Sequence, residues 1–535
     1  MLSFLRLKNN YSKLFIWVVF IIIGSLGFFS IFLITSSWGI SISPDSVSFI
    51  AAAKNILNGR GVTVLYDNTG KYQLNLWHSQ NLDEKIHVML WPPLYPALLA
   101  LLGFTGLNIF FAAKLLNSIL FFFFIILFCY IIKKNTSSTI LSILTSIILL
   151  TSTAILEIFT YAHTEAPFLL FGFLGILFLQ KFLENKKYLF FSLSLLCTIL
   201  SSMSRYSGSV FILTCVVSVI ILDNTELKKR LYNSIIFLSI GMLPLIIWFL
   251  RLKMVGDSYS LRKFLFHPPT LKEWQELILS MTKWITIKNF GIVVSCIIAS
   301  IFLLVIISLT VFTMIKKKGQ IKSNSTFFII IILLIFIFLY FVFHISSKVF
   351  FEAALKISLE RYLSPLFIAF TILIILLLKN MFNIINKKYL YNIFLIILTI
   401  FCIFYIYNGY IWSIKVYRDG QGYSQEYFIK SEIVQEVKKI PENYVIYTNA
   451  PDIIYLFTER VSYMLPFKYN PGLNKPNEHF DKHLKKLEEE LAKNKSIIVF
   501  FSAKTRSYLI SKEELIEKFN LKLFIQKQDG EIYIP

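Results

Sequence analysis

The sequence predicts a mainly α-helical, polytopic membrane protein with about eleven transmembrane helices. The first observation is composition: of 535 residues, 56% are hydrophobic and only 16% are charged. A soluble domain carries about 25% charged residues, so this chain cannot cover a water-facing surface of its own size. The second observation is that apolar runs of about 18 or more residues recur along the chain. The third is that short basic loops separate many of these runs, as in polytopic membrane proteins.

The apolar runs define the predicted spans. They lie at 13–35, 109–132, 138–157, 164–183, 188–203, 207–222, 230–250, 286–315, 326–345, 361–379 and 389–410. The runs 188–203 and 207–222 are short, which suits tilted or partly re-entrant helices. The first run is too long for a signal peptide and lacks a small-x-small cleavage site, so it is expected to remain as a span.

The distribution of Lys and Arg predicts the orientation. Alternate loops, starting with the N-terminal segment, are short and basic, as at Lys133/Lys134 and Lys316–Lys318. By the positive-inside rule these loops are cytoplasmic, and an odd number of spans then leaves the C-terminus outside. We therefore predict a multi-pass protein of the bacterial cytoplasmic (inner) membrane. The formal charge of +22 is explained by these loops, so no nucleic-acid partner is expected.

The loops that alternate with these basic loops indicate where the functional site lies. We divide the chain into a transmembrane domain, residues 1–410, with a first outer loop at 36–108, and a C-terminal extracytoplasmic domain, residues 411–535. The tail reads as a small α/β unit, with strands at Val445–Thr448 and Ser496–Phe501, a helix at 479–493 and a hairpin turn at Asp529-Gly530. Long loops rich in Pro, His, Trp and acids, all on one side, are where binding and chemistry usually occur.

The first outer loop predicts an interfacial helix beginning near Ser46 and ending at Asn58-Gly59. Asp45 fits the N-cap of this helix. It also fits a second role, as a carboxylate just above the bilayer that accepts a proton from an acceptor or binds a cation. The two roles do not exclude each other. Further on, Pro92-Pro93 predicts an extended entry to a helix that starts after Pro93.

Several segments together resemble the GT-C glycosyltransferase superfamily, in particular bacterial relatives of protein O-mannosyltransferases and of lipid A aminoarabinose transferases. The most specific segments are Asp45 with the helix at 52–59 (Ala-Ala-Lys-Asn-Ile-Leu-Asn-Gly) and 91–100 (Trp-Pro-Pro-Leu-Tyr-Pro-Ala-Leu-Leu-Ala). Weaker agreement comes from Thr164-Glu165-Ala166-Pro167, from Arg205, from Glu360-Arg361-Tyr362-Leu363-Ser364-Pro365 and from 446–455 in the tail.

The resemblance implies transfer of a sugar from a polyprenyl-phosphate donor to an extracytoplasmic acceptor (lipid, glycan or protein). The first-loop acid of the family maps to Asp45, and a second acid, at the start of the fourth span, maps to Glu165; both are expected to be catalytic. Many relatives carry two adjacent acids in the first loop. This chain has one, in Pro44-Asp45-Ser46, which argues against a two-carboxylate metal site in this loop. A divalent metal ion stays open as a cofactor.

A phosphate leaving group needs a cation beside it, and Arg205 and Arg361 stand at outer ends of spans. Two roles suit each arginine: it binds the donor phosphate, or it anchors the helix by extending its charged end to the membrane surface. A salt bridge with the neighbouring Glu360 is a third role that suits Arg361. His163, His267, Asp257 and Arg262 are further candidates on the outer side. Of the five histidines in the outer loops before the tail, none stands at HxxH or HxxxH spacing from another, so they define no metal site. They are His78, His87, His163, His267 and His344.

We therefore predict an enzyme: a hexosyl- or pentosyltransferase embedded in membrane lipid that acts by direct displacement with inversion at the anomeric carbon. Two alternatives stay open. One is a surface-polysaccharide ligase or polymerase, which would need a large late outer loop. The other is a multi-pass transporter, which usually shows charged or broken segments at mid-membrane and an inverted repeat.

Overall fold

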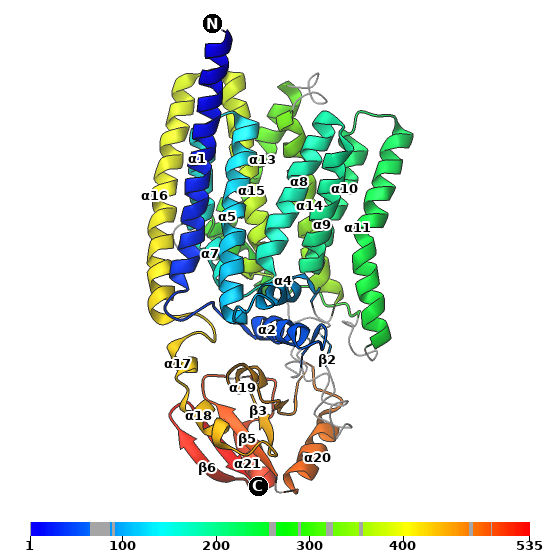
Figure 1. Ribbon diagram of the computed structural model, residues 1–535, viewed down its shortest axis with the longest axis vertical. Helices are drawn as coiled ribbons and strands as arrows, with labels where there is room; N and C mark the ends of the chain where they lie inside the picture. Colours follow the sequence, from blue (N-terminus) through cyan, green and yellow to red (C-terminus); the bar gives the residue numbers. More distant parts are fainter. Residues whose placement is uncertain are drawn as a thin grey trace.

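The computed structural model describes residues 2–64, 86–87, 91–255, 264–286, 290–316, 325–351, 357–469, 475–493, 495–504 and 506–535. Figure 1 shows a bundle of long helices with an α/β unit at one end and the start of α1 at the other. We call the end of the bundle that faces the α/β unit the site end.

The bundle helices are α1 (Leu2–Ile34), α5 (Ile109–Thr136), α6 (Thr139–Thr151), α7 (Thr153–Thr160), α8 (Glu165–Asn185), α9 (Tyr188–Ser204), α10 (Ser209–Leu222), α11 (Leu227–Val255), α13 (Ile292–Lys316), α14 (Ser325–Phe350), α15 (Glu360–Ile385) and α16 (Lys388–Asp419).

The polytopic helical architecture is confirmed. In the described part of the chain, eight helices are long and apolar enough to cross a membrane, and a ninth span results if α6 and α7 are counted as one. These two helices meet at a 59° bend, which the sequence did not suggest. The two short predicted spans correspond to the shorter apolar helices α9 and α10. Every predicted span therefore overlaps a helix.

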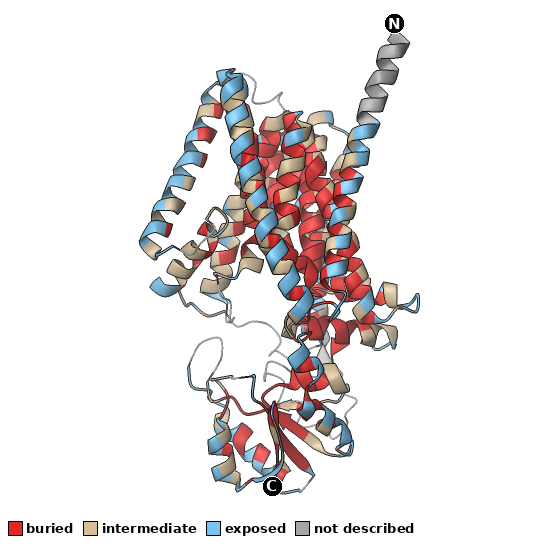
Figure 2. Ribbon diagram, turned by 90° about the vertical axis from the view of Figure 1, so that its left-hand side faces the viewer, coloured by how far each residue is buried: buried red, intermediate tan, exposed pale blue. Residues whose placement is uncertain are grey.

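Burial separates central from peripheral helices. In α8, 78% of the most apolar stretch is buried inside the protein, against 11% in α16. Figure 2 shows this as a buried centre surrounded by helices with exposed outer faces. The exposed residues of α16 include many Ile and Tyr side chains. Such an apolar exterior is the expected surface of a helix that faces lipid.

Two short helices, α2 (Pro44–Leu57) and α4 (Leu94–Gly103), lie across the site end of the bundle (Figure 1). They pack together through Phe49, whose ring meets Trp91 at 5.1 Å and Tyr95 at 5.7 Å in edge-to-face contacts. The predicted first-loop helix and the predicted helix start after Pro93 are both confirmed. After α2 in the chain, the short strands β1 (Thr63–Val64) and β2 (Ile86–His87) pair antiparallel.

The C-terminal unit is a five-stranded mixed sheet with helices. Its elements are α17 (Glu426–Ile429), α18 (Glu432–Lys439), β3 (Val445–Thr448), α19 (Pro451–Thr458), β4 (Tyr463–Met464), α20 (Phe480–Leu491), β5 (Ser496–Phe501), α21 (Lys512–Phe519), β6 (Lys522–Lys527) and β7 (Gly530–Ile534). The strand order is β4-β3-β5-β7-β6, with β3 parallel to both of its neighbours and β7 antiparallel to both of its own. The predicted strands, helix and hairpin are present, while β4 is an addition.

A tight turn attaches this unit to the segment that precedes α2. Gly422 forms a bridge with Ile42, and the Tyr423 amide donates to the Ile42 carbonyl at 2.8 Å. Gly422 has φ +60°, and a Cβ there would lie 2.2 Å from the Ile42 oxygen, so only glycine permits this approach. The Ser424 hydroxyl donates to the Ile40 carbonyl at 2.7 Å. The segment leading into α2 is thus held from the C-terminal side.

Candidate active site

Two chain segments that begin helices lie side by side at the site end. The amide of Ser41 donates to the carbonyl of Thr160 at 2.9 Å, and the amide of Ala162 donates to the carbonyl of Ser41 at 3.0 Å. Asp45 in the first turn of α2 and Glu165 at the start of α8 are therefore brought to the same region. The bend between α6 and α7 lets the chain approach this point before α8 begins.

Ser43, and not Asp45, is the N-cap of α2. The Ser43 hydroxyl accepts from the Ser46 amide at 3.2 Å, and the Ser46 hydroxyl accepts from the Ser43 amide at 3.0 Å, which completes a capping box. The predicted N-cap role of Asp45 is wrong because Pro44 takes the first helical position, which places the cap at Ser43, two residues earlier. The Asp45 carboxylate is consequently available for the site.

Arg361, in the first turn of α15, joins both carboxylates. Its Nη2 donates to Asp45 Oδ2 at 2.8 Å, and its Nε lies 3.8 Å from Glu165 Oε1. The alternative of a salt bridge with Glu360 is wrong, because Glu360 faces Lys283 at 3.5 Å instead. The Asp45 side chain is 30% exposed, so it can meet a substrate while it is held by the guanidinium.

Glu165 has a different environment. Its side chain is only 2% exposed, and its Oε1 lies 2.6 Å from Arg205 Nη1. The Tyr362 ring contacts both arginines, at 5.4 Å from the guanidinium carbon of Arg205 and 4.8 Å from that of Arg361. Two carboxylates and two guanidinium groups thus form a compact cluster whose formal charges cancel. We call Asp45, Glu165, Arg205, Arg361 and Tyr362 the acid–arginine cluster.

His163 supports this cluster from the segment before α8. Its Nε2 lies 2.7 Å from the Ser43 hydroxyl and 3.4 Å from Arg361 Nη1, and its ring stacks on Tyr161 at 4.8 Å. Because a guanidinium only donates, Nε2 serves as an acceptor. Burial lowers the pKa of His163 to about 4, so the ring is neutral at pH 7.

This pKa gives a stability prediction. Between about pH 4 and the ordinary histidine value of 6.5, the unfolded chain binds a proton at residue 163 that the folded chain does not. Stability is therefore full above pH 6.5 and falls as the pH is lowered toward 4, by roughly 3 kcal/mol at most. We expect the Tm of the native protein to fall more between pH 7.5 and 5 than that of His163→Gln, measured in detergent. Parallel curves for the two proteins would contradict the neutral, buried state of His163.

The remaining predicted site residues lie elsewhere. His267 is in the loop before α12 (Leu271–Thr282), where its amide donates to the Val349 carbonyl and its Nδ1 lies 2.9 Å from the Leu265 carbonyl. Among the described residues it has no contact with the acid–arginine cluster. Asp257 and Arg262 lie outside the described residues.

The cluster does not fit a divalent metal ion shared by its two acids. The position between Asp45 and Glu165 is taken by the Arg361 guanidinium, which is close to both. In the described parts of the chain, no group of three or more His, Cys, Asp or Glu side chains is placed to hold a metal.

Three residues at the candidate active site were not predicted from the sequence. Ser43 could have been found, since a serine directly before a proline at a helix start is a known cap pattern. Tyr362 has no sequence signal beyond standing next to Arg361. The third is Arg251 near the site end of α11: its guanidinium stacks on Trp248 at 5.0 Å, and its buried Nη1 has no hydrogen-bond partner among the residues that the structure describes.

The surroundings of Arg251 connect it to the cluster. Trp248 and Leu252 pack with Tyr206, the residue that follows Arg205. Tyr206 also stacks on Phe249 at 5.1 Å. The site end of α11 therefore packs against the turn that carries Arg205. A buried donor without an acceptor is costly, so Nη1 is suited to a ligand oxygen.

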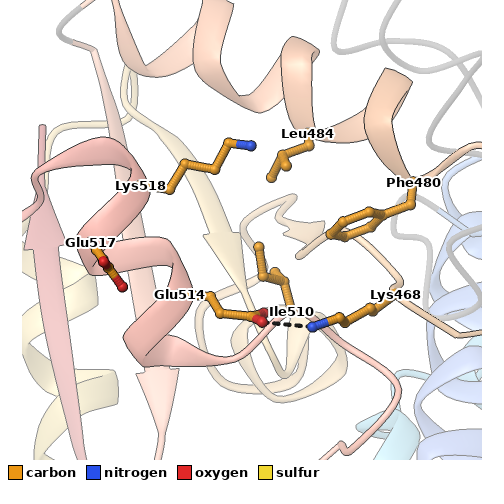
Figure 3. Close-up of a pocket in the computed structure, with 7 residues that line it drawn as sticks. All are labelled: Lys468, Phe480, Leu484, Ile510, Glu514, Glu517 and Lys518. Atoms are coloured by element: carbon orange, nitrogen blue, oxygen red, sulfur yellow. Dashed lines mark hydrogen bonds and ion pairs between the residues drawn. The ribbon is translucent and has the colours of Figure 1, made fainter.

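A separate hollow lies on the α/β unit. It measures about 420 Å³ and opens between α20 and α21 (Figure 3). Lys468 at its edge pairs with Glu514 at 2.6 Å. The hollow shares no residue with the acid–arginine cluster and combines two lysines with two glutamates, so we assign it no ligand.

Comparison with known proteins gives a structural likeness. No family model and no characterised protein sequence matches the chain. The structure aligns with ArnT from Cupriavidus metallidurans bound to undecaprenyl phosphate, with a TM-score of 0.56 and 9% sequence identity over 97% of each chain. For ArnT in the apo state the TM-score is 0.58, at 10% identity over 98% of each chain.

The archaeal oligosaccharyltransferase AglB from Archaeoglobus fulgidus, in complex with an inhibitory peptide and a dolichol-phosphate, aligns with a TM-score of 0.53 at 10% identity. The alignment covers 92% of this chain and 70% of AglB. At these identities the likeness concerns the fold, and it agrees with the resemblance carried by the first-loop segments. The chain shares its fold with ArnT and AglB, and this is the fold that the resemblance to the GT-C superfamily led us to expect.

Proposed function

We propose that the chain is a membrane glycosyltransferase that moves a sugar from a polyprenyl-phosphate donor to an extracytoplasmic acceptor. The observation that carries the proposal is the Asp45 carboxylate, which is partly exposed and fixed by Arg361 at the site end of a GT-C fold. Two of the similar structures contain lipid phosphates, undecaprenyl phosphate in ArnT and dolichol-phosphate in AglB. The positive-inside pattern of the loops supports an extracytoplasmic location for the site.

The proposed reaction is a single displacement. The acceptor hydroxyl or amine gives its proton to Asp45 as its oxygen or nitrogen bonds to the anomeric carbon. The bond from that carbon to the phosphate oxygen breaks, and the phosphate leaves with the electron pair. Arg361 holds Oδ2 of Asp45, which leaves Oδ1 for the acceptor proton. One displacement without a covalent intermediate inverts the configuration of the sugar.

The two acids have different roles in this proposal. Asp45 is exposed enough to touch the acceptor, whereas Glu165 is enclosed and bound to Arg205. Glu165 therefore acts on the reaction through Arg205 and Arg361, whose positions it fixes. Because the acid–arginine cluster is neutral, the donor phosphate needs a further cation beside Arg205 and Arg361. Arg251 provides it, since within the described part of the chain its Nη1 has no hydrogen-bond partner.

This assignment predicts the kinetics of Arg251→Gln. A hydrogen bond to a charged group contributes about 1.5–3 kcal/mol, so the KM for the donor should rise by about tenfold to a hundredfold. The kcat should change little, because Arg251 binds the same phosphate before and during the reaction. The matched control is Arg230→Gln at the opposite end of α11, where Arg230 donates to the carbonyls of Thr225 and Ile220. An unchanged KM in Arg251→Gln would remove Arg251 from the donor site.

The proposed function is tested with purified protein in detergent and a panel of labelled polyprenyl-phosphate sugars, together with one lipid-linked oligosaccharide. We expect transfer from a member of the first group, with inversion at the anomeric carbon. Retention would contradict the single displacement. Transfer only from the oligosaccharide would replace the proposal by a ligase or polymerase.

A further inference from the structure

An apolar groove lies between α1 and α5, which run side by side in the bundle (Figure 1). It measures about 380 Å³. It is lined by Ser25, Phe28, Phe29, Ile119, Phe122 and Phe123. None of these residues belongs to the acid–arginine cluster. Phe29 and Phe123 are more than half exposed, so the groove opens on the outer surface of the bundle.

A buried lysine stands next to this groove. Lys114 of α5 is only 9% exposed, and its ammonium lies 4.0 Å from the centre of the Phe32 ring. Phe32 stacks in turn on Phe28 at 5.8 Å, and Phe28 lines the groove. The rings of Phe32 and Phe28 therefore connect the Lys114 ammonium to the apolar groove.

Lys114 differs from two partly buried lysines of the bundle. Lys134 pairs with Glu184 at 2.5 Å, and Lys186 pairs with Asp223 at 2.7 Å. Within the described part of the chain, no carboxylate pairs with Lys114. A charged side chain inside a membrane protein is costly without a counter-ion, so an anion bound at Lys114 would stabilise it.

The depth of Lys114 fits the level of lipid headgroups. It stands five residues after the start of α5 at Ile109, which is about 7.5 Å along the helix. A helical side chain leans toward the N-terminus of its helix, so the ammonium points toward the membrane surface at the site end. Ile119, Phe122 and Phe123 follow deeper in the bilayer. Lys114 is thus placed to bind a lipid headgroup, and the groove is placed to bind an acyl chain of the same lipid.

We infer that this groove binds an anionic phospholipid of the surrounding bilayer, with its phosphate on Lys114 and an acyl chain along the aromatic side chains. The site is separate from the donor and acceptor sites proposed above and does not depend on them. A lysine that faces an anionic lipid contributes a preference of about fivefold over a zwitterionic lipid, from roughly 1 kcal/mol per charge.

The test is native mass spectrometry of the full-length protein in detergent, titrated with phosphatidylglycerol or phosphatidylcholine of equal chain length. We expect the native protein to bind one phosphatidylglycerol about fivefold more tightly than phosphatidylcholine. Lys114→Gln should bind the two lipids alike, and Lys114→Arg should keep the preference. Lys415→Gln is the control, because Lys415 is an exposed lysine on α16.

Ser25→Phe is a second variant, which keeps Lys114 and fills the groove. It should reduce the binding of both lipids, so the inference stays testable if Lys114→Gln does not fold. Equal binding of the two lipids by the native protein would overturn the inference, and so would an undiminished preference in Lys114→Gln. Displacement of the bound lipid by an equimolar amount of undecaprenyl phosphate would assign the groove to the donor instead.

Discussion

Asp45→Asn is expected to lower the rate of sugar transfer by about a hundredfold or more, the range for loss of a general base. Asparagine has nearly the same shape but cannot take the acceptor proton. It also removes the negative charge that pairs with Arg361 Nη2 at 2.8 Å. The measurement is kcat at saturating donor and acceptor.

Asp419→Asn serves as the matched control. Asp419 is an exposed carboxylate at the end of α16 that pairs only with Arg418 among the described residues. It should transfer sugar at the native rate. If Asp45→Asn also kept the native rate, the single-displacement chemistry proposed for Asp45 would be wrong, although the fold would be unaffected.

Arg205→Met is expected to reduce stability by about 3–5 kcal/mol, because it leaves the buried Glu165 carboxylate without its closest partner. The loss should fall toward the lower end of this range, since Arg361 Nε remains 3.8 Å from the same oxygen. The measurement is the Tm of the purified variant in detergent, compared with the native protein at pH 7.5.

The double variant Arg205→Met/Glu165→Gln separates charge from packing. Without the carboxylate there is no uncompensated charge, so most of the lost Tm should return. A double variant as unstable as Arg205→Met would show that Arg205 matters through packing against Tyr362 and that the ion pair contributes little.

Local patterns predicted the helices well. Long apolar runs defined the spans, and Pro92-Pro93 marked the start of α4. The bend between α6 and α7 was missed, because Thr151-Ser152-Thr153 lies in an otherwise apolar run that periodicity reads as one helix. Strand β4 was missed because two residues are too short to show alternation.

The contacts of the site could not be read from the sequence. Asp45 and Arg361 are separated by 316 positions, and no local pattern states which of several arginines meets which acid. The resemblance to GT-C proteins selected Asp45, Glu165, Arg205 and Arg361, which the fold brings together. The resemblance gave no reason to choose Arg251. The feature that distinguishes Arg251 is a buried nitrogen with no partner among the described residues, and this exists only in the folded chain.

The central claim concerns breakage of the bond between a sugar and a lipid phosphate, whichever acceptor is used. The most direct measurement is release of free polyprenyl phosphate from a labelled polyprenyl-phosphate sugar in proteoliposomes supplied with a cell-envelope extract as the source of acceptor, with the native chain and Asp45→Asn side by side. We predict release by the native chain and at least a hundredfold slower release by the variant. A donor that crosses the bilayer with its sugar still attached would contradict the claim and indicate a transporter.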